Sequence, residues 1–561
     1  MSGLFATLNT SKTGLFAQQQ YINVTSHNIS NAETKGYSRQ NLILQTARPQ
    51  TVVGGVGQVG TGVSMIAIER TRNQFLDYQI RKGNSNLGDY GIRYDYLSEV
   101  EGILNEPTDK GISELISQFF DGWHELSKNQ DTGRKVTAER ARALAEELNN
   151  TYRKLNNTKD NAITEIQSSV FEISNTLDRL NSINKEIMEV TVAGNSPNDL
   201  LDRRDLLLDE LSEKFGIDTR NQALNGIKCT PEGEASINLI RNKAEDQINK
   251  LAFVDEIKDN GNGTYNIKYY KNGDKTSENN SVEVQNIALT AKQYEELKQG
   301  RAIVTKEDGT IDIPTTEAEA DALIFSPPSG KIGGLQEIYK DVDEYINQIN
   351  TLAKALAFSV NAIHTEGIAD SEKVPFFVNS TKGVSPMDYE GINAGNISIN
   401  SAILENVMLI ATGESSTSGS TDNTRALAMV KLRDFTMNLS SLEAGKKPDG
   451  TPYEYRDFVA EHFDTTGNIP EYKKVSSGTK LEGYFKNTVN RVGVQCQTAK
   501  QTVDNQIKSL KGFLERRLSI SGVNLDEEAI NLVQFQHAFQ ANSKVITTVD
   551  QLLDVVINLV R

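Results

Sequence analysis

The most regular pattern of hydrophobic and polar positions lies at the end of the chain, between Gly522 and Arg561. Apolar residues recur there every seven positions along one line, and a second, almost wholly apolar line runs beside it. Two such lines, three and four residues apart, form the seam through which helices wind around one another. The pattern predicts a helix whose seam consists of Leu525, Leu532, Phe535, Phe539, Asn542, Ile546, Val549, Leu553, Val556 and Val560.

A second seam of the same spacing lies at the start of the chain. Leu8, Leu15, Ile22 and Ile29 repeat every seven residues, with a less apolar line beside them. This helix should end near Asn31, because a glycine suited to a left-handed turn follows shortly afterwards. We predict that the two terminal helices, far apart in the sequence, pair as one coiled coil and form an assembly surface.

A seam of this kind is more often the core of a single domain than an interface between copies. Two helices alone, however, bury too little apolar surface to offset the conformational entropy that is lost when both become ordered. We therefore expect the ends to be mobile in the free monomer and to become ordered when neighbouring subunits cover them.

Between the ends, the hydrophobic period changes several times. Residues 37–68 read as extended chain, and residues 72–215 read as helix with a break from Gly194 to Pro197. From 217 to 328, alternating apolar residues and hairpin signals replace the helical period. The hairpin signals are Asn225-Gly226, Asn260-Gly261 and Asn272-Gly273. This stretch predicts a small, mostly β domain that is inserted into a helical one.

Helical spacing returns from Leu335 to Ile363 and again from Phe485 to Leu514. The stretch between them reads as a second, irregular insertion, with a low-complexity loop at residues 413–421. The predicted fold is mainly α with inserted β-rich domains, in a nested, out-and-back arrangement with a terminal coiled coil and an elongated helical bundle. The predicted domains are a terminal assembly domain (1–36 and 521–561), a helical bundle (37–216, 331–369 and 480–520), a β-rich outer domain (217–330) and an irregular insertion (370–479).

Composition limits the classes of function. The chain has 561 residues and a formal net charge of −16, which argues against a general nucleic-acid binder. Both ends are depleted in charge, as suits surfaces that become covered. No stretch is apolar enough for a membrane span, and the start of the chain lacks the pattern of a secretory signal peptide. Cys229 and Cys496 are too few for a metal cluster or a disulfide framework.

The motifs that resemble catalytic or cofactor sites are incomplete. Gly55, Gly57 and Gly60 spell the dinucleotide fingerprint, but a strand rather than a helix should follow, so we interpret them as a hairpin or loop. His124-Glu125 begins like a zinc-protease motif, but Lys128 stands where the second histidine should be. We therefore expect no enzymatic activity, no cofactor and no metal site.

Two further stretches resemble a known family. Residues 26–40, SHNISNAETKGYSRQ, are similar to the N-terminal signature of bacterial flagellar rod, hook and hook-associated axial proteins. Residues 521–542, SGVNLDEEAINLVQFQHAFQAN, resemble more specifically the C-terminus of the FlgK type of hook-associated protein. Asp422-Asn423 and Arg425-Ala426-Leu427 are also similar to that family. His27 and Lys35 depart from the commonest form of the N-terminal signature.

The resemblance implies a ring of identical subunits at the junction between hook and filament, in contact with hook protein and with a second junction protein. It further implies an extracellular location, reached by export through the flagellar type III channel without a cleaved signal peptide. A cytoplasmic export chaperone that binds the C-terminal helix is also implied. The role would be mechanical, with the terminal helices polymerising into the wall of a tube.

Two alternatives stay open at this point. Within the same class, the chain could be a hook or distal-rod protein. From another class, it could be a secreted enzyme or adhesin with a ligand site in one of the inserted segments, 217–328 or 370–479. A convergent polar pocket in those segments would favour the second alternative.

Overall fold

The computed structural model describes residues 2–51, 58–104, 111–369, 373–381, 391–415, 421–474 and 478–560. It divides into two compact units that each combine distant parts of the chain. Unit 1 holds Met1–Asp89, Gln167–Gly333 and Asp504–Arg561, and unit 2 holds Tyr90–Ile166 and Gly334–Val503. Four long helices contribute residues to both units: α2 (Gln74–Leu104), α4 (Gln130–Val192), α8 (Gly330–Thr365) and α13 (Leu481–Ser521). The predicted mainly helical class with β-rich insertions is confirmed, whereas the four-domain division stays a prediction.

In unit 1 the chain begins with α1 (Ser2–Ser30) and ends with α14 (Leu525–Val560). A two-stranded antiparallel ribbon of β1 (Gln40–Thr46) and β4 (Val63–Arg70) follows α1, and β2 (Gln50–Thr51) pairs with β3 (Gln58–Val59) farther along it. Gly55 and Gly57 lie outside the described residues. Because β4 rather than a helix follows Gly60, the ribbon does not provide the helix N-terminus that a dinucleotide site needs.

The break predicted between two helices separates α4 from α5 (Asn198–Lys214). Gly194 has a φ of 82°, the left-handed conformation that glycine adopts without steric cost. Pro197 comes directly before α5, where its missing amide hydrogen is tolerated. The chain therefore turns back on itself, and α5 brings a series of aspartates to the ribbon.

The insertion of unit 1 is β-rich, as the hairpin signals predict. A hairpin of β5 (Ile217–Asn221) and β6 (Ile227–Pro231) leads into an antiparallel sheet of β7 (Asn249–Asp259), β8 (Thr264–Lys271), β9 (Ser281–Ala288) and β10 (Ala302–Lys306), in the order β10-β7-β8-β9. Helices α6 (Ala291–Gly300) and α7 (Glu317–Leu323) contribute Leu297, Ala320 and Leu323 to its core, with Ile267 and Tyr269 from the sheet.

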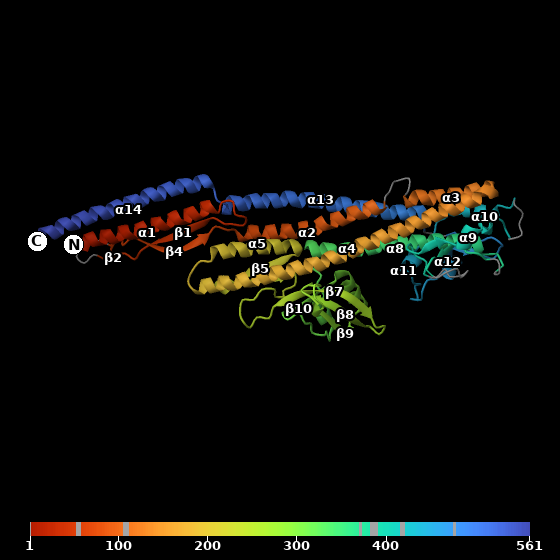
Figure 1. The fold of residues 1–561 in the computed structure, drawn as a ribbon, viewed down its shortest axis with the longest axis horizontal. Coiled ribbons are helices and arrows are strands. Elements are labelled where there is room, and N and C mark those ends of the chain that lie inside the picture. The colour runs from red at the N-terminus through yellow and green to blue at the C-terminus, as the bar shows by residue number, and fades with distance from the viewer. Residues whose placement is uncertain are drawn as a thin grey trace. The chain divides into compact units, whose positions relative to one another are not determined.

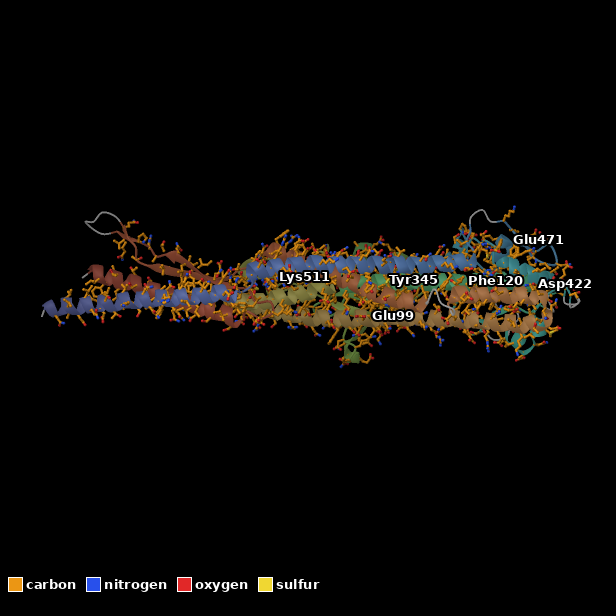
Figure 2. The ribbon with its side chains drawn as sticks, turned by 90° about the horizontal axis from the view of Figure 1, so that it is seen from above. Glu99, Phe120, Tyr345, Asp422, Glu471 and Lys511 are labelled. Carbon is orange, nitrogen blue, oxygen red and sulfur yellow. The ribbon has the colours of Figure 1, made fainter. Side chains whose placement is uncertain are left out.

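Unit 2 consists of α3 (Ile112–Lys128), parts of the four long helices, and short elements from the irregular insertion. Its core includes Trp123, Phe120 and Tyr345, each at most 2% exposed. Phe120 and Tyr345 are labelled in Figure 2. Part of the low-complexity stretch, residues 416–420, lies outside the described residues. The short elements are β11 (Phe377–Asn379), β12 (Ile397–Ile399), α9 (Ser401–Glu405), α10 (Thr424–Leu432), α11 (Ser440–Ala444), α12 (Tyr455–His462), β13 (Phe463–Asp464) and β14 (Glu471–Tyr472).

A fully buried arginine organises the irregular insertion. The Arg425 guanidinium donates to the carbonyl oxygens of Gly413, Glu366 and Asn468 at 3.2, 3.0 and 2.9 Å, and also to that of Ile363. Burial lowers the pKa of Arg425 to about 10. This side chain therefore holds loops together through their backbone, a role that the sequence does not reveal.

We expect Arg425→Lys to lower the free energy of unfolding by roughly 3 kcal/mol, because a single ammonium cannot reach this set of carbonyls and leaves buried acceptors without donors. Urea denaturation measures the change. Arg433→Lys, in an exposed ion pair with Asp121 at 3.2 Å, is the control and should cost less than about 1 kcal/mol. If the two substitutions lower the free energy of unfolding equally, Arg425 does not hold the loops together in this way.

Candidate assembly site

The two ends of the chain lie against each other. Helices α1 and α14 run side by side over most of their length, and both chain ends lie at the same extremity (Figure 1). The Tyr21 ring stacks on Phe535 with centroids 4.5 Å apart, and a Cβ placed on Gly14 would lie 3.0 Å from the Asn542 side-chain oxygen. Because the later residue of α1 meets the earlier residue of α14, the pair is antiparallel. The predicted pairing of the chain ends is confirmed.

The buried line along α14 is the predicted seam. Val549 is 4% exposed, and Leu532, Phe535, Phe539, Asn542, Ile546, Leu553 and Val556 are partly buried. Leu8, Leu15, Ile22 and Ile29 are partly buried on α1. The seam is thus occupied within one chain, and its role as a contact between copies stays a prediction.

Two seam residues at the ends of α14 differ from the rest. Leu525 is 50% exposed, although the heptad pattern places it in the seam. Extending the register that joins Gly14 to Asn542 brings Leu525 level with Asn31, just beyond the end of α1, so no helix covers it. The side chain of Val560 lies outside the described residues.

The chain leaves α1 through a turn that is built on Asn28. The Asn28 amide exchanges two hydrogen bonds of 3.0 Å with the backbone of Gln40, so it pairs with β1 as a neighbouring strand would. The Tyr37 hydroxyl donates to the Asn28 oxygen at 2.7 Å. Burial, together with Asp199, Asp202 and Glu528, raises the pKa of Tyr37. The signature residues after α1 therefore fix how the ribbon leaves the helix.

Aspartates on α5 anchor this turn and the ribbon. Asp202 accepts hydrogen bonds from the Ser38 amide at 2.9 Å and from the Ser38 hydroxyl at 2.8 Å. The Arg70 guanidinium, at the end of β4, donates to Asp202 at 2.8 Å and to Asp205 at 2.6 Å. Through these bonds, α5 holds the segment that leaves α1 and the end of β4.

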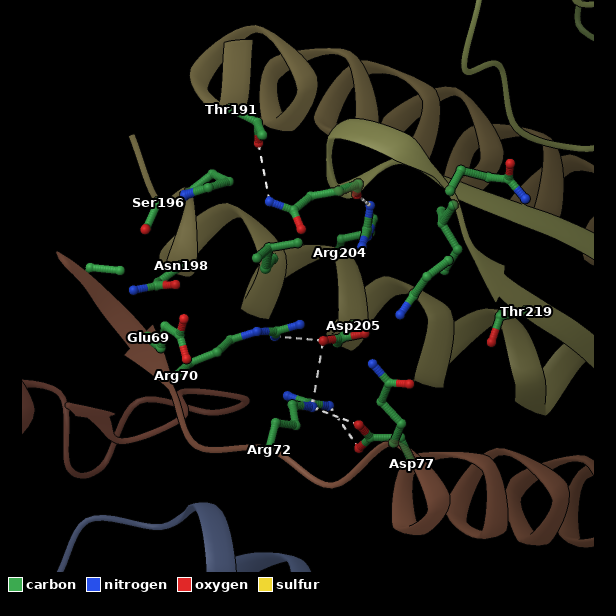
Figure 3. A pocket seen from close by; sticks show the side chains of 18 of the residues that line it. Glu69, Arg70, Arg72, Asp77, Thr191, Ser196, Asn198, Arg204, Asp205 and Thr219 are labelled. Carbon is green, nitrogen blue, oxygen red and sulfur yellow. Dashed lines mark hydrogen bonds and ion pairs between the residues drawn. The ribbon is translucent and has the colours of Figure 1, made fainter. Parts of the chain in front are cut away.

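These contacts belong to a larger group of ion pairs, which we call the Arg–Asp cluster. Figure 3 shows four of its residues, Arg70, Arg72, Asp77 and Asp205. Arg72 pairs with Asp77 at 2.8 Å, while Arg81 pairs with Asp205 at 2.9 Å and with Asp209 at 3.0 Å. From the end of α13, Arg517 reaches Asp209 at 2.6 Å. The cluster consists of Arg70, Arg72, Arg81 and Arg517 with Asp77, Asp202, Asp205 and Asp209.

The electrostatics of the cluster centre on Asp205. Burial disfavours its charged form, but the guanidinium groups of Arg72, Arg70 and Arg81 outweigh burial and hold its pKa well below the usual range. Nearby Arg204 instead has its pKa lowered to about 10 by burial, with Arg70 and Arg81 adding repulsion. Each aspartate of the cluster faces at least one guanidinium, so its carboxylates serve as structural anchors.

Two hollows of unit 1 lie near these elements. One, of about 870 Å³, borders the cluster and has Ile66, Phe75 and Tyr78 exposed in its walls. Another, of about 800 Å³, lies between α4 and the insertion. Ion pairs such as Lys250–Asp178 neutralise charges at its edge. The described residues contain no group of histidine, cysteine, aspartate and glutamate side chains arranged for a metal ion. The first hollow does gather polar groups, but its arginines and aspartates pair with one another, and most of its lining lies outside the inserted segments 217–328 and 370–479.

Comparison with known proteins identifies the family. The model of the flagellar hook-associated protein FlgK helical domain matches residues 97–286 and 240–377, which together span half of the chain. Models of the flagella basal body rod protein and of the flagellar basal body rod FlgEFG protein C-terminal region match residues 8–37 and 514–559. The chain belongs to the FlgK family.

Similarity to FlgK proteins extends over the full length. The chain is 27% identical to flagellar hook-associated protein 1 of Bacillus subtilis over all of this chain and 99% of that protein. It is 24% identical to the protein of the same name from Salmonella typhimurium, over 98% and 99% of the two chains. The flagellar hook junction protein FlgK of Burkholderia pseudomallei has a similar fold, with a TM-score of 0.51 at 13% identity, over 79% of this chain and all of that one.

As a FlgK family member, the chain is a structural component of the flagellum. The two ends that match rod-protein models are the ends that pair as α1 and α14. No helix among the described residues is long and apolar enough to cross a membrane. His124 and Glu125, the beginning of a zinc motif, are exposed on α3.

Proposed function

We propose that this chain forms the joint between hook and filament by polymerising through the module of α1 and α14. The observation that carries the proposal is the pairing of the two ends, Gly14 against Asn542 and Tyr21 against Phe535, which makes one assembly element from distant segments. Family membership and the named flagellar relatives support the location. The work of the joint is mechanical, and the protein is not an enzyme.

The partners follow from this location. Identical copies form a ring, hook protein lies beneath it, and a second junction protein lies above it. The chain reaches the outside of the cell through the flagellar type III channel without a cleaved signal peptide. A cytoplasmic export chaperone binds α14 beforehand, because an uncovered helix with exposed apolar residues needs protection from aggregation.

Immunogold labelling of intact flagella tests the location. Antibody raised against the β-rich insertion should label a single zone at the hook–filament junction. Labelling along the whole hook would favour the hook-protein alternative, and labelling of the rod would favour the distal-rod alternative. Either pattern would contradict the proposal.

Deletion of residues 542–561 should abolish binding of the export chaperone, because it removes the second half of α14. A pull-down with the purified chaperone measures the loss. The matched control is a chain that lacks residues 2–21 and keeps α14 intact, which should still be captured. If the shortened chain still binds the chaperone as strongly as the unchanged chain, the assignment of the chaperone site to α14 is refuted.

A further inference from the structure

α14 exposes a second apolar line in addition to its seam. Ile530, Val545, Leu552 and Val555 are 60, 41, 47 and 56% exposed, although they are large apolar side chains. They belong to a series that advances by three or four residues and contains no charged side chain. We call this series the second stripe: Ile530, Gln534, Ala538, Ala541, Val545, Thr548, Leu552 and Val555.

From Gln534 onward, the second stripe follows the seam at a fixed offset. Val545 and Leu552 each come one residue before a seam residue, as do Thr548 and Val555. One residue corresponds to a rotation of about 100° around a helix with 3.6 residues per turn. α14 therefore presents two adjacent faces, of which one packs on α1 of its own chain and the other is uncovered.

The outer face of α1 has matching properties. Phe5 and Phe16 are 55 and 51% exposed. They lie eleven residues apart, which is about three helical turns and places them on the same side. Lys12 is the one lysine, arginine, aspartate or glutamate in α1, and its ammonium lies over the Phe16 ring at 5.8 Å from the centroid. The face combines two exposed aromatic rings with Asn9 and a single charge, that of Lys12.

We propose that the second stripe of α14 packs on the Phe5–Phe16 face of α1 in a neighbouring copy of the chain. This inference rests on the proposed function and names the surface through which the copies join. It continues the contact that exists within each chain: every α14 then lies between its own α1 and the α1 of a neighbour.

The arrangement is heterologous, since one copy contributes α14 and the other contributes α1. Heterologous contacts pass from copy to copy and give a ring where the rotation between copies closes, whereas a self-complementary contact stops at a pair. Packing α14 against α14 would leave Phe5 and Phe16 exposed. A neighbouring α1 covers the second stripe and the two phenylalanine rings at once.

The first test places charge on the second stripe. Val545→Asp with Leu552→Asp leaves the seam untouched, so the purified chain should keep its helicity and unfolding temperature. In cells that lack the chain's own gene, its incorporation into flagella should fall at least tenfold, as measured by immunoblotting of isolated flagella. Ser543→Asp is the matched control, because Ser543 is exposed and lies on the side of α14 opposite the second stripe. It should be incorporated as the unchanged chain is.

The second test identifies the partner face. Phe5→Lys with Phe16→Lys should also reduce incorporation, and combining these lysines with the two aspartates should restore part of it through opposite charges. Normal incorporation of the aspartate variant would overturn the inference while the unchanged chain still occupies the junction. Normal incorporation of the lysine variant, or no recovery in the combination, would overturn the assignment to α1. Absence of the unchanged chain from the junction would instead contradict the proposed function.

Discussion

Phe539→Asp should leave the β-rich insertion and unit 2 folded but prevent the chain from joining the flagellum. Phe539 is partly buried in the seam between α14 and α1. A carboxylate at that place loses water without gaining a cationic partner, which costs several kcal/mol and separates the helices. Motility and filament number in cells that carry only this variant measure the effect, and we expect non-motile cells without filaments.

The control for this prediction is Phe539→Leu, which keeps an apolar side chain in the seam and should support swimming. Circular dichroism of the purified variants separates loss of the terminal pair from loss of the whole fold. Cells with Phe539→Asp that build normal filaments would show that pairing of the ends is dispensable, which would contradict the proposed function.

Asp205→Asn should lower the free energy of unfolding at pH 7 by roughly 3–5 kcal/mol, because it leaves buried guanidinium groups with too few carboxylates. Asp205 contacts Arg70 and Arg81 at 2.6 and 2.9 Å. Urea denaturation measures the difference. The control is Asp178→Asn, which removes a pair with Lys250 in which the aspartate is 56% exposed. That change should cost less than about 1 kcal/mol.

The pH dependence gives this prediction a second measurement. Because the pKa of Asp205 in the folded protein lies below its unfolded value of about 3.9, its contribution is complete above that pH. It is lost as the pH falls toward the folded-state pKa. The stability gap between the unchanged chain and Asp205→Asn should therefore narrow below pH 4 by about 1 kcal/mol per pH unit. A gap that stays constant down to pH 2 would show that Asp205 is not held by the guanidinium groups.

Local patterns in the sequence predict the elements of this fold well. The heptad lines predict which side of α14 packs on α1. They can do so because the apolar face of a helix depends only on residues a few turns apart in the sequence. Asn272 and Gly273 both adopt positive φ, 55° and 70°, as an Asn-Gly hairpin signal requires. Asn542, the polar member of the seam, lies against Gly14, so the one interruption in the pattern fits a place where the helices approach closely.

The Arg–Asp cluster could not be predicted from the sequence. Arg81 and Asp205 are 124 residues apart, and Arg517 and Asp209 are 308 apart. Their arrangement depends on how α2, α5 and α13 meet, which no local pattern specifies. The exposure of Leu525 depends in the same way on where α1 ends.

The second stripe cannot be recognised from the sequence alone, for a different reason. Steps of three and four residues are visible in the sequence from Ala538 to Val555, but the seam beside them has the same period and larger residues. A helix with one strong seam is usually read as having one partner. Recognising that α14 has two uncharged faces required knowing that the first is already occupied within the chain.

The most direct test of the account is cryo-electron microscopy of the hook–filament junction in intact flagella, at a resolution that traces individual helices. We expect α1 and α14 of the same chain to lie antiparallel in the tube wall, with Tyr21 against Phe535. A map in which the two ends of one chain lie apart, or in which one of them is absent from the wall, would contradict it.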